Sequence, residues 1–396
     1  MSLQQTPRAN RLHIGIFGRR NAGKSSLINA LTLQEIALVS PVAGTTADPV
    51  YKSMEIHGIG PVVFVDTAGF DDQGDLGKLR VEKTRETVEK IDVALVVFAD
   101  TDISLELSWI KLFQKNGTPV ITVVNKVDVR TDAEEIAAAV HQQSGLMPIL
   151  ASALEGTGME EIRNELRRSI PEDYEAISII GSLAGPGDTV LLVMPQDIQA
   201  PKGRLILPQV QTLRELLDRK CIVTCVTTDQ MDAALAALVL PPHLIITDSQ
   251  VFRQVYEKKP AESKLTSFSI LFANYKGDLA YFAESASAIE SLTESSRVLI
   301  AEACTHAPVG EDIGREQLPR LLKKRVGPGL QVDLVSGNDF PKDLSPYDLI
   351  IHCGACMFNR KLVLSRVEQA KIKRIPMTNY GVVLAYLTGI LDQIDY

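Results

Sequence analysis

Residues 12–31 read LHIGIFGRRNAGKSSLINAL, and this stretch decides the fold of the N-terminal part of the chain. The apolar run 12–17 predicts a buried strand. Residues 18–25 match the phosphate-binding pattern G-x-x-x-x-G-K-[ST], and the apolar residues after them predict a helix. Because the motif requires a strand before it and a helix after it, we predict a P-loop nucleotide-binding domain.

The defining residues of this loop have separate roles toward a nucleotide. Gly18 and Gly23 allow the backbone amides to close around the phosphates. Lys24 places a positive charge beside the β- and γ-phosphates, and the Ser25 hydroxyl is a ligand for Mg²⁺. The loop is therefore expected to bind a nucleoside triphosphate together with Mg²⁺.

The base is predicted to be guanine. The segment 125–128 (NKVD) follows an apolar strand, and the Asp128 carboxylate can accept hydrogen bonds from guanine N1 and N2, which adenine cannot supply. The segment 152–154 (SAL) follows another strand and offers a backbone amide to guanine O6. In this order and at this spacing, the motifs predict a GTP-binding protein.

The segment 66–69 (DTAG) and the pair Thr45 and Thr46 complete the predicted site. Asp66 would hold Mg²⁺ through water, the Gly69 amide would meet the γ-phosphate, and a switch loop would bring a threonine hydroxyl to the metal. The predicted Mg²⁺ ligands are Ser25, Thr46 and Asp66. The predicted catalytic residues are Lys24, Thr46, Asp66 and Gly69. The predicted GTP-binding residues are Gly18, Asn21, Ala22, Gly23, Lys24, Ser25, Ser26, Thr45, Thr46, Asp66, Gly69, Asn125, Lys126, Asp128, Ser152, Ala153 and Leu154.

To about Pro171, these motifs make the chain resemble the translation-factor-related GTPases of the Era and TrmE type. Phe70 stands where Ras-like enzymes carry a water-orienting glutamine, so we expect slow hydrolysis unless another element completes the site. Asn21 stands where potassium-using TrmE-like members have asparagine. The resemblance therefore implies that K⁺ binds at Asn21 and supplies positive charge beside the phosphates.

The rest of the chain alternates apolar strands of five to six residues with helices, which is typical of parallel sheets covered on both faces. We predict an α/β protein with three α/β domains, an N-terminal P-loop GTPase followed by two parallel-sheet domains, with boundaries at 1–174, 175–262 and 263–396. The run 267–272 (SFSILF) is predicted to be a strand. Cys221 and Cys225 lie on one strand and are expected to be core residues, because free cysteine is usually buried.

Composition narrows the class of protein. The net charge of −8 disfavours a nucleic-acid partner, and no apolar run is long enough to span a bilayer. The N-terminal residues lack the apolar segment of a signal peptide, so we expect a cytoplasmic protein with reduced thiols. Clustered cysteines in that compartment are metal ligands more often than disulfides.

Three of the five cysteines gather with two histidines near the C-terminus. Cys304 and His306 follow one predicted strand. His352 and Cys353 end another, which Cys356 follows, and 45 residues separate the two histidines. In a parallel sheet both clusters would emerge at the carboxyl edge, where open α/β folds bind ligands. Such a donor set suits tetrahedral Zn²⁺, or a 4Fe–4S cube with one iron left open.

The pattern C-T-H, 45 residues and H-C-G-A-C resembles the C-x-H…H-C-x-x-C signature of the HydF family of FeFe-hydrogenase maturation GTPases, as does the order of domains. The resemblance implies that Cys304, Cys353 and Cys356 ligate a 4Fe–4S cluster, with His306 and His352 as candidate further ligands. It also implies a homodimeric carrier. This carrier would receive a dinuclear iron precursor from radical-SAM maturases and deliver it to apo FeFe-hydrogenase.

Two other functions fit the same residues. One is a zinc-stabilised regulatory GTPase that acts by binding alone. The other is an RNA-associated GTPase of the Era and TrmE type, against which the acidic balance counts.

Overall fold

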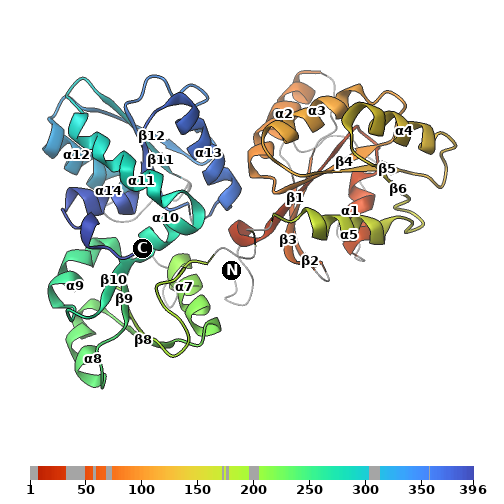
Figure 1. Ribbon diagram of the computed structural model, residues 1–396. Coiled ribbons are helices and arrows are strands. Elements are labelled where there is room, and N and C mark those ends of the chain that lie inside the picture. Colours follow the sequence, from red (N-terminus) through yellow and green to blue (C-terminus); the bar gives the residue numbers. More distant parts are fainter. Residues whose placement is uncertain are drawn as a thin grey trace. The chain divides into compact units, whose positions relative to one another are not determined.

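The computed structural model describes residues 8–32, 50–56, 59–67, 74–171, 174, 178–195, 205–302, 313–355 and 357–396. The chain divides into two compact units, Met1–Glu175 and Ala176–Tyr396. Both units are built from strands and helices in alternation (Figure 1). None of the helices in these described ranges combines the length and the apolar character needed to cross a bilayer.

The first unit contains a six-stranded sheet in the order β2-β3-β1-β4-β5-β6. Only the β2–β3 pair is antiparallel among the pairs of this sheet that the structure describes. The strands are β1 (Leu12–Gly18), β2 (Val50–Ile56), β3 (Gly60–Asp66), β4 (Val93–Phe98), β5 (Val120–Asn125) and β6 (Ile149–Ala151). The predicted parallel core of a P-loop domain is thereby confirmed.

Helices cover both faces of this sheet. Helices α1 (Lys24–Thr32) and α5 (Met159–Ser169) pack on one face, and α3 (Ser104–Lys115) and α4 (Ala133–Ser144) pack on the other. Cover on both faces leaves β1 and β4 buried along their whole length, and it explains why all their residues except His13 are apolar or glycine. Helix α2 spans Gly74–Thr87.

The second unit contains two four-stranded sheets, and every described strand pair in them is parallel. The middle sheet has the order β10-β9-β7-β8, and the C-terminal sheet has the order β12-β11-β13-β14. The strands are β7 (Thr189–Val193), β8 (Ile222–Val226), β9 (Leu244–Thr247), β10 (Lys264–Ser267), β11 (Arg297–Glu302), β12 (Gln331–Ser336), β13 (Leu349–His352) and β14 (Met377–Asn379). The predicted pair of parallel sheets after the GTPase domain is confirmed.

Helices of the second unit join its two sheets through one hydrophobic core. That core includes Leu191 and Ile245 of the middle sheet, Leu299 and Ile350 of the C-terminal sheet, and Ile270 from a helix that packs against both sets. The helices are α7 (Leu207–Asp218), α8 (Met231–Ala237), α9 (Phe252–Lys258), α10 (Phe268–Lys276), α11 (Leu279–Ala286), α12 (Leu318–Val326), α13 (Arg360–Lys373) and α14 (Tyr380–Leu387).

Two expectations about this unit are wrong. Most of the run 267–272 is not a strand, because β10 ends at Ser267 and α10 begins at Phe268. The Ser267 side chain caps the helix by accepting a hydrogen bond from the Ile270 amide at 3.3 Å. A short apolar run fits a buried helix as well as a strand, which explains the error.

The other error concerns one cysteine. Cys221 is buried as expected, but Cys225 is exposed on β8, the edge strand of the middle sheet. The predicted domain boundaries stay predictions. β10 follows the predicted boundary at residue 262, yet it pairs with β9 and completes the middle sheet.

Substitution Ile270→Ala should destabilise the second unit by about 2–5 kcal/mol, because Ile270 is fully buried in the shared core. The single tryptophan, Trp109, lies in the first unit. Chemical unfolding should therefore show an earlier far-UV circular dichroism transition and an unchanged Trp109 fluorescence transition. The exposed-site variant Ile372→Ala should leave both transitions unchanged. A shift of the fluorescence transition with Ile270→Ala would contradict the division into units.

Candidate functional site

The loop between β1 and α1 has the backbone geometry that its glycines allow. Gly23 has a φ of 89°, and a Cβ there would lie 2.2 Å from the Asn125 amide nitrogen. Gly18 has a φ of 151°, and a Cβ there would lie 2.5 Å from the Val97 carbonyl oxygen. Asn21 is left-handed at a φ of 59°, a conformation that asparagine tolerates better than most residues. The sequence of the loop thus matches its shape.

Lys24 and Ser25 place the phosphate and metal chemistry at the start of α1. The buried Lys24 ammonium donates hydrogen bonds of 2.9 Å to the carbonyls of Gly18 and Arg19, which hold it at the centre of the loop. The Ser25 hydroxyl donates to the Asp66 carboxylate at 2.8 Å. Two of the predicted Mg²⁺ ligands are therefore adjacent, and oxygen ligands of this kind suit Mg²⁺.

Asn125 connects the phosphate loop to the predicted guanine loop. Its side-chain amide donates to the Ala22 carbonyl at 2.8 Å, and its carbonyl accepts from the Ala153 amide at 3.2 Å. Its side chain is almost completely buried, so these two bonds hold the loops in one relative position. Asp128 lies partly exposed three residues later, and Ser152 is buried. Leu154 is 85% exposed, so only its backbone can serve the predicted site.

An ion-pair cluster that the sequence analysis missed supports the same loop. Arg19 donates to the buried Glu106 carboxylate at 3.1 Å and to Asp102 at 2.8 Å. Burial raises the pKa of Glu106, whereas hydrogen bonds from Ser104 and Arg19 lower the pKa of Asp102 to about 2. Glu106 lies 87 positions from Arg19, so no local pattern indicates this contact.

Several predicted nucleotide-site residues lie outside the described residues. These are Thr45, Thr46, Gly69 and the neighbouring Phe70. Their predicted roles remain predictions.

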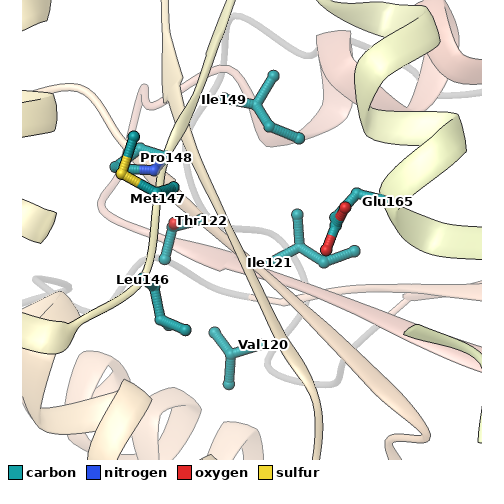
Figure 2. Close-up of a pocket in the computed structure, with 8 residues that line it drawn as sticks. All are labelled: Val120, Ile121, Thr122, Leu146, Met147, Pro148, Ile149 and Glu165. Carbon is teal, nitrogen blue, oxygen red and sulfur yellow. The ribbon is translucent and has the colours of Figure 1, made fainter. Parts of the chain in front are cut away.

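A cavity of about 320 Å³ lies at the opposite end of the same sheet (Figure 2). It is lined by the first residues of β5, the 146–149 segment and Glu165. The residues 125–128 follow the other end of β5, so this cavity is separate from the nucleotide site.

The cysteine region of the second unit is built on two adjacent strands. β11 and β13 pair in parallel with Ala301 opposite His352, and the Cys353 amide donates to the Ala301 carbonyl at 2.9 Å. In the sheet order β12-β11-β13-β14, the connection after β11 leads to its outer neighbour β12, and the connection after β13 leads to its outer neighbour β14. The two connections therefore run to opposite sides of the sheet. This arrangement makes a topological switch point, where open α/β sheets bind ligands at the carboxyl ends of strands.

Cys353 lies at this switch point in a turn suited to a sulfur ligand. The Ala355 amide donates to the Cys353 sulfur at 3.4 Å, and Ala355 adopts a left-handed φ of 50°. Amide hydrogen bonds to sulfur stabilise thiolates and tune iron–sulfur centres. Cys304, His306 and Cys356 lie outside the described residues. Within the parts of the chain that the structure describes, no three His, Cys, Asp or Glu side chains gather as a metal site.

His352 is fully engaged inside the fold. Arg366 can only donate, so its guanidinium donates to His352 Nε2 at 2.9 Å, and Nδ1 therefore carries the proton donated to the Cys353 carbonyl at 2.7 Å. Burial and the neighbouring Arg366 lower the pKa of His352 to about 3, so the ring is neutral at pH 7. With both ring nitrogens occupied, this geometry disfavours the interpretation of His352 as an iron ligand.

Glu302 ends β11 beside this region. Its carboxylate accepts hydrogen bonds from Arg315 at 3.2 Å, Ser336 at 3.3 Å and Tyr380 at 3.4 Å. These contacts hold the end of the strand that precedes Cys304 in the sequence.

Three family models together match most of the chain. The model described as "Hydrogen maturase F tetramerization domain" matches residues 280–394, and "Hydrogen maturase F dimerization domain" matches residues 179–277. The model "50S ribosome-binding GTPase" matches residues 13–126. The first unit is therefore a GTPase domain, and the second carries two oligomerization domains.

Curated relatives match the GTPase domain. The chain is 39% identical over 163 residues to the tRNA modification GTPase MnmE of Heliobacterium modesticaldum, a match that covers 40% of this chain and 34% of that protein. It is 44% identical over 129 residues to the GTPase Der of Wolinella succinogenes, covering 30% of this chain and 26% of that protein. The chain thus spans about a third or less of the length of these relatives.

Among solved structures, Era in complex with MgGDPNP and 16S ribosomal RNA matches with a TM-score of 0.36 and 20% identity, covering 54% of this chain and 92% of that chain. NFeoB from S. thermophilus bound to GDP.AlF4- and K+ matches with a TM-score of 0.33 and 22% identity, covering 45% of this chain and 66% of that chain. Likeness at this level is too slight to carry an argument.

Substitution Asn125→Ala should weaken GDP and GTP binding by about 10- to 30-fold, because it removes both hydrogen bonds that hold the phosphate and base loops together. Fluorescent-nucleotide titration would measure the dissociation constant. The surface variant Asn164→Ala should bind like the native protein. Native affinity in Asn125→Ala would show that the two loops hold their positions without this side chain.

Proposed function

This chain belongs to the hydrogen maturase F family, and we propose that it is a GTP-hydrolysing carrier with a 4Fe–4S centre. In this proposal it receives a dinuclear iron precursor from radical-SAM maturases and delivers it to apo FeFe-hydrogenase. The observation that carries the proposal is Cys353 at the switch point between β11 and β13, tied by its own amide to Ala301.

Chain length supports convergence of the predicted cluster ligands. Cys304 follows the end of β11 by two residues, and Cys356 follows Cys353 by three. A residue of extended chain spans at most about 3.6 Å, so both sulfurs belong to segments that start at the same edge of the sheet. Cys304, Cys353 and Cys356 would hold three irons of a cube, and an exchangeable ligand would occupy the fourth.

The cluster would supply an open iron to which an exogenous group can bridge. The contribution of this chain is to orient the ligands. The Ala355 amide donates to the Cys353 sulfur, and Glu302 anchors the strand before Cys304. The small residues Gly354 and Ala355 leave room beside the sulfur for a bulky centre.

At the nucleotide site, Lys24 would neutralise charge on the β- and γ-phosphates, and Ser25, Thr46 and Asp66 would hold Mg²⁺. The left-handed Asn21 would place K⁺ beside the phosphates, and Asp128 would select guanine. The two sites share no residue, so we infer that hydrolysis acts as a conformational gate for partner docking and not as the source of cluster chemistry.

The proposed function also implies an oligomeric state, protein partners and a cellular compartment. The matched oligomerization domains support self-association, for which we propose a homodimer as the basic form. Apo FeFe-hydrogenase and the radical-SAM maturases are the proposed protein partners, and the cytoplasm is the proposed compartment.

Two alternative functions can each be tested by a separate experiment. A zinc-stabilised regulatory GTPase would bind Zn²⁺ in place of iron and sulfide, so metal analysis after anaerobic purification distinguishes it. An RNA-associated GTPase is suggested by the relative MnmE, which is named a tRNA modification GTPase, and salt-dependent RNA binding would reveal it.

Substitution Cys353→Ser should abolish cluster assembly and hydrogenase maturation while leaving GTP turnover at the native rate, because Cys353 lies in the second unit and the nucleotide site in the first. Iron and sulfide content, EPR of the reduced protein and phosphate release would be measured together. The exposed Cys225→Ser is the matched control and should retain all three. Equal loss of GTP turnover in Cys353→Ser would make that cysteine a structural residue.

Replacing KCl by NaCl should slow GTP turnover at least tenfold, because K⁺ is expected to stabilise charge that develops on the phosphates. Asn21→Ala should lower turnover in KCl to the NaCl level. Turnover that is equal in both salts would rule out K⁺ at Asn21.

A further inference from the structure

Helix α10 forms one wall of the cysteine region. A cavity of about 10 Å³, room for about one water molecule, is bordered by Phe272, Ala273, Lys276 and Gly277 of this segment and by Cys353 and Gly354. Helix α10 lies within residues 179–277, matched by the dimerization-domain model, whereas Cys353 lies within the tetramerization-domain match. A segment of one domain therefore lines the thiol region of the other.

Lys276, the last residue of α10, makes a polar contact with the chain that follows Cys353. Its side chain is only 2% exposed, and its ammonium donates to the Phe358 carbonyl at 3.0 Å. The Phe358 amide donates to the Ala355 carbonyl at 3.0 Å and so closes a turn two residues after Cys353. The bond from Lys276 fixes the far end of this turn.

A second buried cation contacts the same turn. Arg366 is 2% exposed, and its guanidinium carbon lies 4.7 Å from the ring centroid of Phe340 and 5.2 Å from that of Phe358. It also donates to the Gly337 carbonyl at 2.7 Å. Two buried positive charges therefore contact Phe358 at the end of this turn.

Helix termini add to this positive field. The turn leads into the N-terminus of α13, which Asn359 caps, and Asn379, the cap of α14, lines the cavity with Lys276. Helix N-termini carry partial positive charge. All these groups favour an anion, and a 4Fe–4S cube held by three thiolates is anionic and gains a further negative charge on reduction.

We propose that Lys276 is a charge-compensating and positioning residue for the cluster, so that α10, which lies within the dimerization-domain match, raises the cluster's reduction potential. This inference rests on the proposed function. The ammonium stabilises the reduced cluster more than the oxidised one, because attraction grows with the added electron. It also holds the turn that carries Cys353 through the Phe358 carbonyl.

The test is an EPR-monitored redox titration of the full chain reconstituted anaerobically with iron and sulfide. Lys276→Met removes the charge and the hydrogen bond, whereas Lys276→Gln removes the charge and keeps a donor for Phe358. Both should titrate at a more negative potential than the native protein. Lys276→Arg should restore a potential near the native value.

Lys371→Met is the matched control. It removes one positive charge and a 2.7 Å ion pair between Lys371 of α13 and Asp278, the N-cap of α11, but it lies at a half-exposed site. It should leave the potential unchanged. If Lys276→Met fails to fold, Lys276→Gln decides the result.

The possible results distinguish the proposed carrier function from the proposed role of Lys276. A native protein that takes up no cluster would overturn the proposed function and this inference with it. Full cluster uptake with an unchanged potential in Lys276→Gln would overturn the inference alone. An equal shift in Lys371→Met would show an effect of net charge and would also overturn it.

Discussion

The pairing of β11 with β13 is the constraint on which the second unit's function depends. Parallel neighbours end at the same edge of the sheet, and the bond from the Cys353 amide to the Ala301 carbonyl fixes their register at that edge. Because β12 and β14 lie on opposite outer sides, the connections from β11 and β13 lead in opposite directions, the arrangement at which open α/β sheets bind ligands. A one-residue slip would move every side chain of β13 to the other face and carry Cys353 away from the switch point.

The first unit uses the same constraint for a different ligand. β1 lies between β3 and β4, and the phosphate loop emerges where the chain direction across the sheet reverses. Hydrogen bonds between the loops then fix the positions of the side chains at this site. Asn125 braces the phosphate loop against the base loop, and Lys24 is held by two loop carbonyls. The predicted nucleotide site and the proposed cluster site thus lie at the carboxyl ends of strands in two separate sheets. This separation fits the proposed gate and carrier better than a single active centre.

The sequence predicted those parts that depend on local pattern. The loop 18–25, the strands β1, β7 and β11 and the positions of the cysteines after strands follow from spacing and apolar periodicity. Long-range contacts were not predictable: Arg19 with Glu106, and Lys276 with Phe358, join positions 87 and 82 residues apart. The start of helix α10 was mistaken for a strand because a short apolar run fits a strand as well as a buried helix. The contact of the candidate ligand His352 with Arg366, 14 residues later, was likewise not predictable from the local sequence.

The central claim is that sulfurs from the segments after β11 and β13 share one inorganic cube. X-ray absorption spectroscopy of the anaerobically reconstituted full chain tests this most directly, since it identifies the metal and its neighbours together. We expect the spectrum to show iron with a shell of sulfur ligands and an iron–iron scattering shell. Zinc bound by sulfur and nitrogen, with no metal–metal shell, would contradict it.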